Sequence, residues 1–194
     1  MLEKVEVVSH QTGQLTGVQL TRAEVIEQKA WCRSTNVFVL NTQGEVLCHQ
    51  RSLNKERLPG VWVTHFGGHV GVNENPDGNA LKELEEEANI ITGASQLIRW
   101  STFPVEKTSR VKEVRLWMHN FVALFEGDVS TVKPQSGEVE QFKWSSIEEI
   151  LASERQKPHM WNAGIHNFHI EYYCLRSALT AAHARRLIQI PDQL

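Results

Sequence analysis

Residues 67–90 read GGHVGVNENPDGNALKELEEEANI, a pair of glycines followed by a polar loop and a run with helical periodicity. Asn75 suits the N-cap position, Pro76 can take the first helical position, and Asn89 tolerates the left-handed backbone that often ends a helix. Apolar residues between them recur at the spacing of one helical face, namely Ala80, Leu81, Leu84 and Ala88. The stretch therefore predicts a loop that leads into a helix over residues 76–88.

Three carboxylates share one stripe of this predicted helix. Glu83, Glu86 and Glu87 stand at relative positions zero, three and four, whereas Glu85 points elsewhere. Like charges at this spacing cost only about a few tenths of a kcal/mol each on an exposed helix, so a bare acidic stripe is most simply a solvated surface. The glycine pair and Glu74 in front of the helix change this interpretation, because together they define a loop-helix unit that leads onto the stripe.

The loop-helix unit resembles the Nudix box, the signature of the Nudix superfamily of diphosphate-cleaving enzymes. From Gly68 to Ile90 the chain reads G-x5-E-x7-K-E-L-x-E-E-x-N-I, which agrees with the family pattern in spacing throughout. Lys82 replaces the usual arginine and Asn89 the usual glycine. Lysine keeps the positive charge without the planar fork of arginine, and asparagine still tolerates the left-handed turn.

The resemblance implies an α/β fold, an α/β/α sandwich with a mixed sheet in which the box forms a catalytic loop-helix-loop. It implies that Glu83, Glu86 and Glu87 bind a divalent cation together with the Gly67 carbonyl, with Mg²⁺ as the default ion and Mn²⁺ as an alternative. Oxygen donors of this kind suit such hard cations. The implied reaction is hydrolysis of a diphosphate linkage in a nucleoside diphosphate derivative or related organic diphosphate, with Glu83 or Glu86 as general base.

Three residues outside the box are candidates for the same site. Glu138 precedes an apolar run that resembles the strand carrying an extra metal-binding carboxylate in the family; the alternative is an exposed strand end. Arg51 and Lys55 lie between a predicted strand and the Pro-Gly turn at residues 59–60, where they could clamp an outer phosphate. A solvated loop is the alternative for this pair.

The segment from Gln50 to Trp62, followed by Gly68-His69, looks like the isopentenyl-diphosphate isomerase branch of the superfamily. The isomerases carry a catalytic cysteine immediately before this Gly-His pair, where the present chain has Gly67. Hydrolysis is therefore favoured over isomerisation. A noncatalytic nucleotide-binding Nudix domain is a third hypothesis, and the retained carboxylates argue against it.

The rest of the chain predicts strands alternating with a few helices. The three expected parts of one domain are an N-terminal extension over residues 1–34, a Nudix domain over 35–155 and a C-terminal helical segment over 156–194. Strands are expected at 4–8, 36–40, 46–49, 61–63, 97–105, 114–125 and 138–144, and further helices after Thr21 and at 146–151 and 171–190. This pattern predicts a mixed sheet with helices packed against its faces.

Composition sets the class of protein. The chain has 194 residues, of which 41% are hydrophobic and 22% charged, with a formal net charge of -3. These values are typical of a compact domain, and the charge is too small to attract a nucleic-acid polymer. The charged N-terminus and the lack of a long apolar run predict a cytoplasmic protein without a membrane partner.

The expected partner is a small diphosphate substrate. A homodimer is a further alternative, because the apolar C-terminal helix could form an interface between two copies. The chain has three cysteines far apart in the sequence, Cys32, Cys48 and Cys174. Their number and spacing fit neither a disulfide framework nor a zinc site, so we expect buried small side chains.

Overall fold

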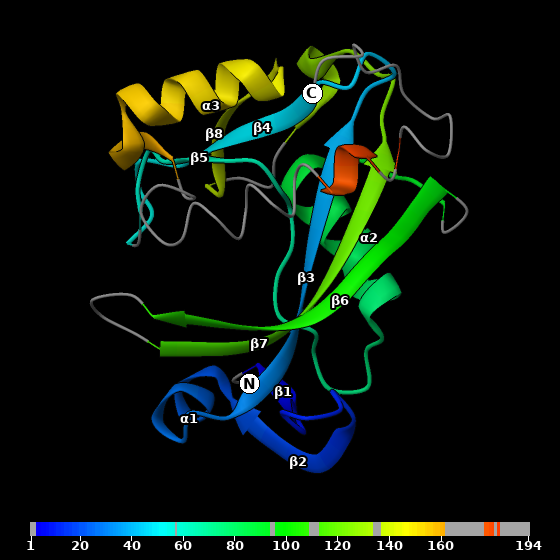
Figure 1. Ribbon diagram of the computed structural model, residues 1–194, viewed down its shortest axis with the longest axis vertical. Helices are drawn as coiled ribbons and strands as arrows, with labels where there is room; N and C mark the ends of the chain where they lie inside the picture. The colour runs from blue at the N-terminus through cyan, green and yellow to red at the C-terminus, as the bar shows by residue number, and fades with distance from the viewer. Residues whose placement is uncertain are drawn as a thin grey trace.

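The computed structural model describes residues 3–56, 58–93, 96–108, 113–133, 137–161, 177–180 and 182 (Figure 1). Its strands are β1 (Lys4–Val8), β2 (Leu15–Thr21), β3 (Trp31–Leu40), β4 (Val46–Arg51), β5 (Trp62–Val63), β6 (Leu97–Thr108), β7 (Glu113–Leu124) and β8 (Val139–Ser145). The helices are α1 (Arg22–Glu27), α2 (Pro76–Ala88) and α3 (Ile147–Gln156), and residues 177–180 are also helical.

The strands form one mixed sheet, as predicted. Its main path runs β2-β1-β3-β4-β5, while β7 pairs with β3, β6 with β7, and β8 with β4. β3 and β7 run parallel, in register from Trp31 opposite Arg115 to Leu40 opposite Leu124. On the other side of β7 lies β6, which pairs with it as a long antiparallel hairpin. The centre of the sheet is therefore built from segments that lie far apart in the sequence.

Helices cover both faces of the sheet, which confirms the expected α/β fold. Successive side chains of a strand point to opposite faces. Val37 and Val39 accordingly pack in one buried cluster with residues of α2, and Phe38 and Leu40 in another with residues of α3. Figure 1 shows α2 behind the central strands and the orange helical stretch at residues 177–180 in front of them.

The predicted bounds of α2 are confirmed, because its end signals are local. The Asn75 side chain accepts a hydrogen bond from the Gly78 N–H at 2.8 Å, and Pro76 begins the helix. Asn89 ends it with φ at 53°, the left-handed conformation expected at this position. The helix that carries Glu83, Glu86 and Glu87 therefore has the bounds that the sequence predicted.

The N-terminal strands β1 and β2 extend the sheet beside β3, and α1 packs against them. β1 pairs with β2 along its length and with β3 at Val7 opposite Cys32. The helix expected after Thr21 is present, and a capping box begins it, since Thr21 and Glu24 exchange hydrogen bonds. A third buried cluster joins this unit to the long hairpin and comprises Val5, Leu20, Val25, Cys32, Val105, Leu116 and Met118.

Two features differ from the sequence expectations. β3 begins at Trp31, several residues before the expected start, because the polar residues Ser34 and Thr35 are buried in the parallel ladder with β7. The expected boundary between residues 34 and 35 thus falls inside a continuous strand.

Cys32 and Cys48 are buried and free as predicted, whereas Cys174 and most of the helix expected at 171–190 lie outside the described residues. Within the described ranges, no helix has the length and apolarity of a membrane span.

Candidate functional site

The glycine loop is held against β3 by backbone hydrogen bonds. Phe66 and Val37 exchange hydrogen bonds of 2.7 and 3.0 Å between their N–H and carbonyl groups. The Gly68 carbonyl accepts hydrogen bonds from the Thr35 N–H at 2.9 Å and the Ser34 hydroxyl at 2.8 Å. Within the described part of the chain, no group donates to the Gly67 carbonyl. That oxygen is therefore available to a ligand.

The two glycines have different roles. Gly67 has φ at +141°, and a Cβ there would overlap the Thr35 carbonyl oxygen and lie 2.8 Å from its carbon. Only glycine allows the loop to approach β3 this closely. A Cβ at Gly68 would instead overlap Oε1 of Glu83 and lie 2.9 Å from its Cδ. Gly68 thus leaves space for a carboxylate of α2 against the loop.

Glu87 is tied directly to the glycine pair. The Gly67 N–H donates a hydrogen bond to its Oε2 at 3.0 Å. Burial raises the pKa of Glu87 to about 8, and the charges of Glu83 and Glu138 add to the increase against the lowering effects of the Gly67 hydrogen bond and Arg51. The hydrogen bond from Gly67 and the charge of Arg51 therefore do not fully offset the effect of burial on the ionised carboxylate.

Burial also raises the pKa of Glu83, and the charge of Glu86 contributes in the same direction. The side chain of Glu83 is half-buried, whereas Glu86 is exposed. Of the three predicted metal ligands on α2, the structure therefore brings Glu83 and Glu87 onto the glycine loop and leaves Glu86 at the rim. Among the residues described, no group of three or more His, Cys, Asp and Glu side chains is arranged so that it could hold a metal ion.

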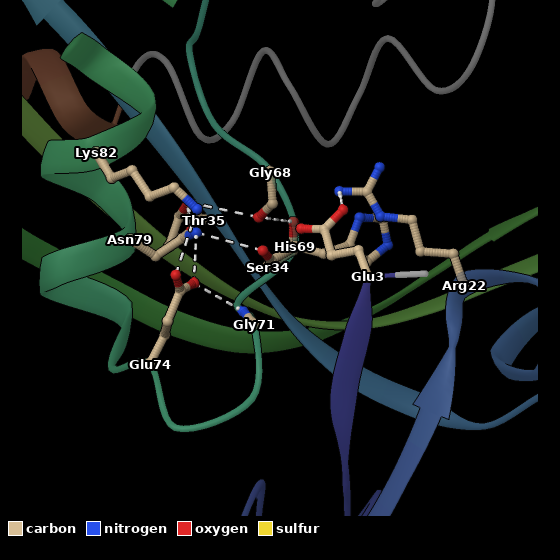
Figure 2. A network of polar contacts seen from close by, with 10 residues as sticks. All are labelled: Glu3, Arg22, Ser34, Thr35, Gly68, His69, Gly71, Glu74, Asn79 and Lys82. Atoms are coloured by element: carbon tan, nitrogen blue, oxygen red, sulfur yellow. Dashed lines mark hydrogen bonds and ion pairs between the residues drawn. The ribbon is translucent and has the colours of Figure 1, made fainter. Parts of the chain in front are cut away.

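Glu74 fixes the loop between the glycines and α2 (Figure 2). Its carboxylate accepts hydrogen bonds from the Gly71 N–H at 2.9 Å and from Lys82 Nζ at 3.3 Å. Although partial burial raises it, the pKa of Glu74 is lowered on balance by these contacts. The lysine that replaces the family arginine therefore still binds the carboxylate of the loop.

Asn79 joins the loop to both α2 and β3, a role that the sequence did not suggest. Its Oδ1 accepts a hydrogen bond from the Thr35 hydroxyl at 2.7 Å, and its Nδ2 donates to the His69 carbonyl at 3.2 Å. Only 1% of Asn79 is exposed. The available signal was a polar residue on the apolar face of a helix, next to Ala80.

The N-terminal unit reaches the same loop. Figure 2 shows the ion pair between Arg22 and Glu3, of 2.9 Å, beside His69. The Val72 N–H donates a hydrogen bond to the Lys4 carbonyl of β1 at 3.3 Å. Arg33 of β3 joins both parts, because it donates hydrogen bonds to the Glu6 carboxylate at 2.9 Å and to the Glu74 carbonyl at 3.1 Å. The extension therefore contributes to holding the loop that carries the candidate site.

A pocket of about 110 Å³ opens beside Gly67 and Glu87. Its lining residues are His49, Arg51, Leu58, Val63, His65, Gly67 and Glu87. Arg51 is therefore placed with the box carboxylate, as its proposed contact with phosphate requires. Lys55 is not among the lining residues; its ammonium group forms an ion pair with Glu138.

The two histidines of the pocket were not singled out from the sequence. His49 lies two residues before Arg51 on β4, so the pleat of the strand places both side chains on one face. His65 immediately precedes the Phe66 that pairs with β3. The signal for His49 was its spacing from Arg51, and it could be interpreted only once the face of the strand was known.

Comparisons with known proteins match the part of the chain that carries the candidate site. A model of the NUDIX domain matches residues 31–164. The isopentenyl-diphosphate Delta-isomerase of Corynebacterium glutamicum is 27% identical over 131 residues, or 66% of this chain and 68% of that protein. An uncharacterised Nudix hydrolase of Pseudomonas aeruginosa is 38% identical over 71 residues, or 37% of this chain and 42% of that protein.

A solved structure shows the same fold at lower sequence similarity. The dihydroneopterin triphosphate pyrophosphohydrolase of E. coli aligns with a TM-score of 0.55 and 18% identity, over 78% of this chain and 99% of that one. The matched family model spans the glycine loop, α2, β4 and β8. Every residue of the candidate site thus lies within the matched region.

Proposed function

The chain belongs to the Nudix family, and from this premise we propose that it is a Mg²⁺-dependent hydrolase of a diphosphate linkage. The substrate class is a nucleoside diphosphate derivative or a related organic diphosphate. The observation that carries the proposal is the convergence of Glu83 and Glu87 on the glycine pair. Both carboxyls have raised pKa values there, mainly because they are buried, so a bound cation would stabilise their ionised forms.

The donor set fits Mg²⁺. The available donors are oxygen atoms, from the carboxylates of Glu83 and Glu87 and from the Gly67 carbonyl. Glu86 lies exposed on the same helix as the two carboxylates. Mg²⁺ favours oxygen ligands, keeps several waters, and commonly binds through one or two carboxylates plus substrate phosphate oxygens. An incomplete set of protein donors, which water and substrate oxygens would complete, suits this behaviour. When bound, the cation supplies Lewis acidity toward a phosphoryl oxygen.

Side chains and backbone groups of the protein would orient the ligands, bind the phosphate and accept the proton. The Gly67 N–H orients Glu87, and Arg51 faces the pocket where a phosphate would bind. Glu83 and Glu86 are the candidates for the general base that takes a proton from the attacking water. The raised pKa of Glu83 favours it, because a base is most effective when its pKa approaches the working pH.

Glu138 is a further candidate metal ligand that lies outside α2. Its charge contributes to the raised pKa of Glu87, which supports a role beside that carboxyl. The ion pair with Lys55 would then have to open or be shared when the substrate binds. Lys55 would then be able to contact a phosphate.

Isomerisation is the second candidate, favoured by the identity of the Corynebacterium glutamicum relative. The isomerases are expected to need a cysteine where this chain has Gly67. A side chain at this position would overlap the Thr35 carbonyl, and φ at +141° would strain any residue with a Cβ. The loop as built therefore favours hydrolysis over isomerisation.

The test is turnover with Mg²⁺ across a panel of nucleoside diphosphate derivatives, dinucleoside polyphosphates and isoprenoid diphosphates. Glu87→Gln should reduce turnover by orders of magnitude, because it removes a charge needed for the cation. Glu85→Gln, an exposed change on the same helix, is the matched control and should retain activity. Absence of turnover with every substrate would favour a noncatalytic binding domain, and an active Glu87→Gln variant would refute the assigned site.

A further inference from the structure

His49 is a buried polar residue that the proposed hydrolysis does not yet use. It lies on β4 two residues before Arg51, and both side chains line the pocket beside Gly67 and Glu87. Only 4% of His49 is exposed. Histidine at such a position either satisfies its ring nitrogens inside the protein or offers one of them to a ligand.

Aromatic neighbours hold the His49 ring in place. Its centroid lies 4.8 Å from that of Phe66 at an interplanar angle of 37°, and 6.4 Å from that of Phe142 in an edge-on arrangement. Among the residues that the structure describes, none forms a hydrogen bond with the buried Nδ1 atom. A native protein rarely leaves such an atom without a partner unless a ligand or water completes it.

The surroundings of His49 decide which kind of ligand would fit. Burial, reinforced by the charge of Arg51, lowers the pKa of His49 to about 3, so the ring is neutral at physiological pH. A neutral imidazole carries one N–H and can donate it without a counter-ion. Beside it the Arg51 guanidinium supplies positive charge. An anionic oxygen acceptor is the group that both side chains can bind together.

We propose that His49 is a substrate-binding residue whose Nδ1–H donates a hydrogen bond to a diphosphate oxygen held beside Arg51 in this pocket. The inference rests on the proposed function, because it assigns a contact within the same site. It differs from the assignments above in naming a neutral donor as part of phosphate recognition. Removing the ring nitrogens of His49 should therefore remove one hydrogen bond to the phosphate without changing the charge of the pocket.

A purely structural role for His49 makes a different prediction. A histidine needed for packing would cause loss of stability on replacement, whatever the ligand. A ligand-directed nitrogen that is buried without a partner instead favours an apolar ring of similar shape in the ligand-free protein. His49→Phe should therefore melt no lower than the parent protein while binding the diphosphate more weakly.

The experiment uses methylenediphosphonate, a diphosphate that cannot be hydrolysed, titrated calorimetrically into the full chain with Mg²⁺ present. His49→Phe should weaken binding by about tenfold or more, the loss expected for one hydrogen bond to a charged group. His49→Asn places an amide near the position of Nδ1 and should recover most of the affinity. His119→Phe is the matched control, because His119 lies on β7, outside the pocket lining, and contacts Thr102 at 3.2 Å.

The outcomes separate this inference from the proposed function. Unchanged affinity in His49→Phe, or a large fall in melting temperature in both His49 variants, would overturn the role of His49. If the parent protein fails to bind methylenediphosphonate with Mg²⁺ at all, the proposed function itself fails. Binding that is lost in Glu87→Gln but intact in His49→Phe would leave the metal site standing and reject only the contact from His49.

Discussion

Replacing Glu87 by glutamine should stabilise the metal-free protein, and the gain should grow with pH. Burial holds the pKa of Glu87 near 8 in the folded protein, against an ordinary value of 4.5. Between these pH values the folded state keeps the proton that the unfolded chain has released. The stability associated with the neutral carboxyl is therefore fully present below pH 4.5 and is lost as the pH rises toward 8.

The structure sets the size of the effect. Each pH unit within that window costs about 1.4 kcal/mol of unfolding free energy. The whole window, from 4.5 to about 8, corresponds to an upper limit of roughly 5 kcal/mol. Glutamine is neutral throughout, so its expected gain is up to about 3 kcal/mol at neutral pH and less than about 1 kcal/mol near pH 5. Glu87 is partly exposed, which places the real values below these limits.

Urea unfolding followed by circular dichroism, with a chelator present, would measure the effect. The parent protein and Glu87→Gln are compared at about pH 5 and at neutral pH, and Glu85→Gln reports what loss of an exposed charge on the same helix does. We expect the difference between Glu87→Gln and the parent to increase with pH. A constant difference across this range would refute the raised pKa of Glu87.

Two further substitutions test how the loop is held. Gly68→Ala should lower activity with little change in the urea midpoint, because its Cβ displaces the flexible end of Glu83 from the loop; a fully active variant, measured with the best substrate, would contradict this geometry. Asn79→Ala should lower the unfolding free energy by about 2 kcal/mol, because it leaves the Thr35 hydroxyl and the His69 carbonyl without their partner. Urea unfolding measures this loss, and a change within error would show that the network carries no net stability.

Local signals made α2 predictable. Asn75, Pro76 and Asn89 each act on the backbone next to them, so both ends of the helix could be identified without knowing the fold. The same spacing placed Glu83 and Glu87 on one face, since a helical repeat depends only on the chain itself. The two glycines could be recognised as a place of close approach, but not what approaches each of them.

Contacts between distant segments could not be obtained in this way. The burial of Ser34 and Thr35 depends on β7 and on the glycine loop, which lie far along the chain. The ion pair between Lys55 and Glu138 likewise joins two candidate residues that the sequence treated separately. The pocket around His49 exists only because β4, β5 and the loop meet, and no periodicity within β4 shows this.

The parallel ladder between β3 and β7 has a consequence for the order of folding. The side chains of Asn36 and Asn120, opposite each other in that ladder, are 84 residues apart in the sequence. Closing so long a loop is entropically costly, and folds dominated by such pairings form slowly. The glycine loop and α2 lie within this interval. During synthesis the carboxylates of α2 therefore leave the ribosome before β7 does, and the site can be assembled only after β7 has paired with β3.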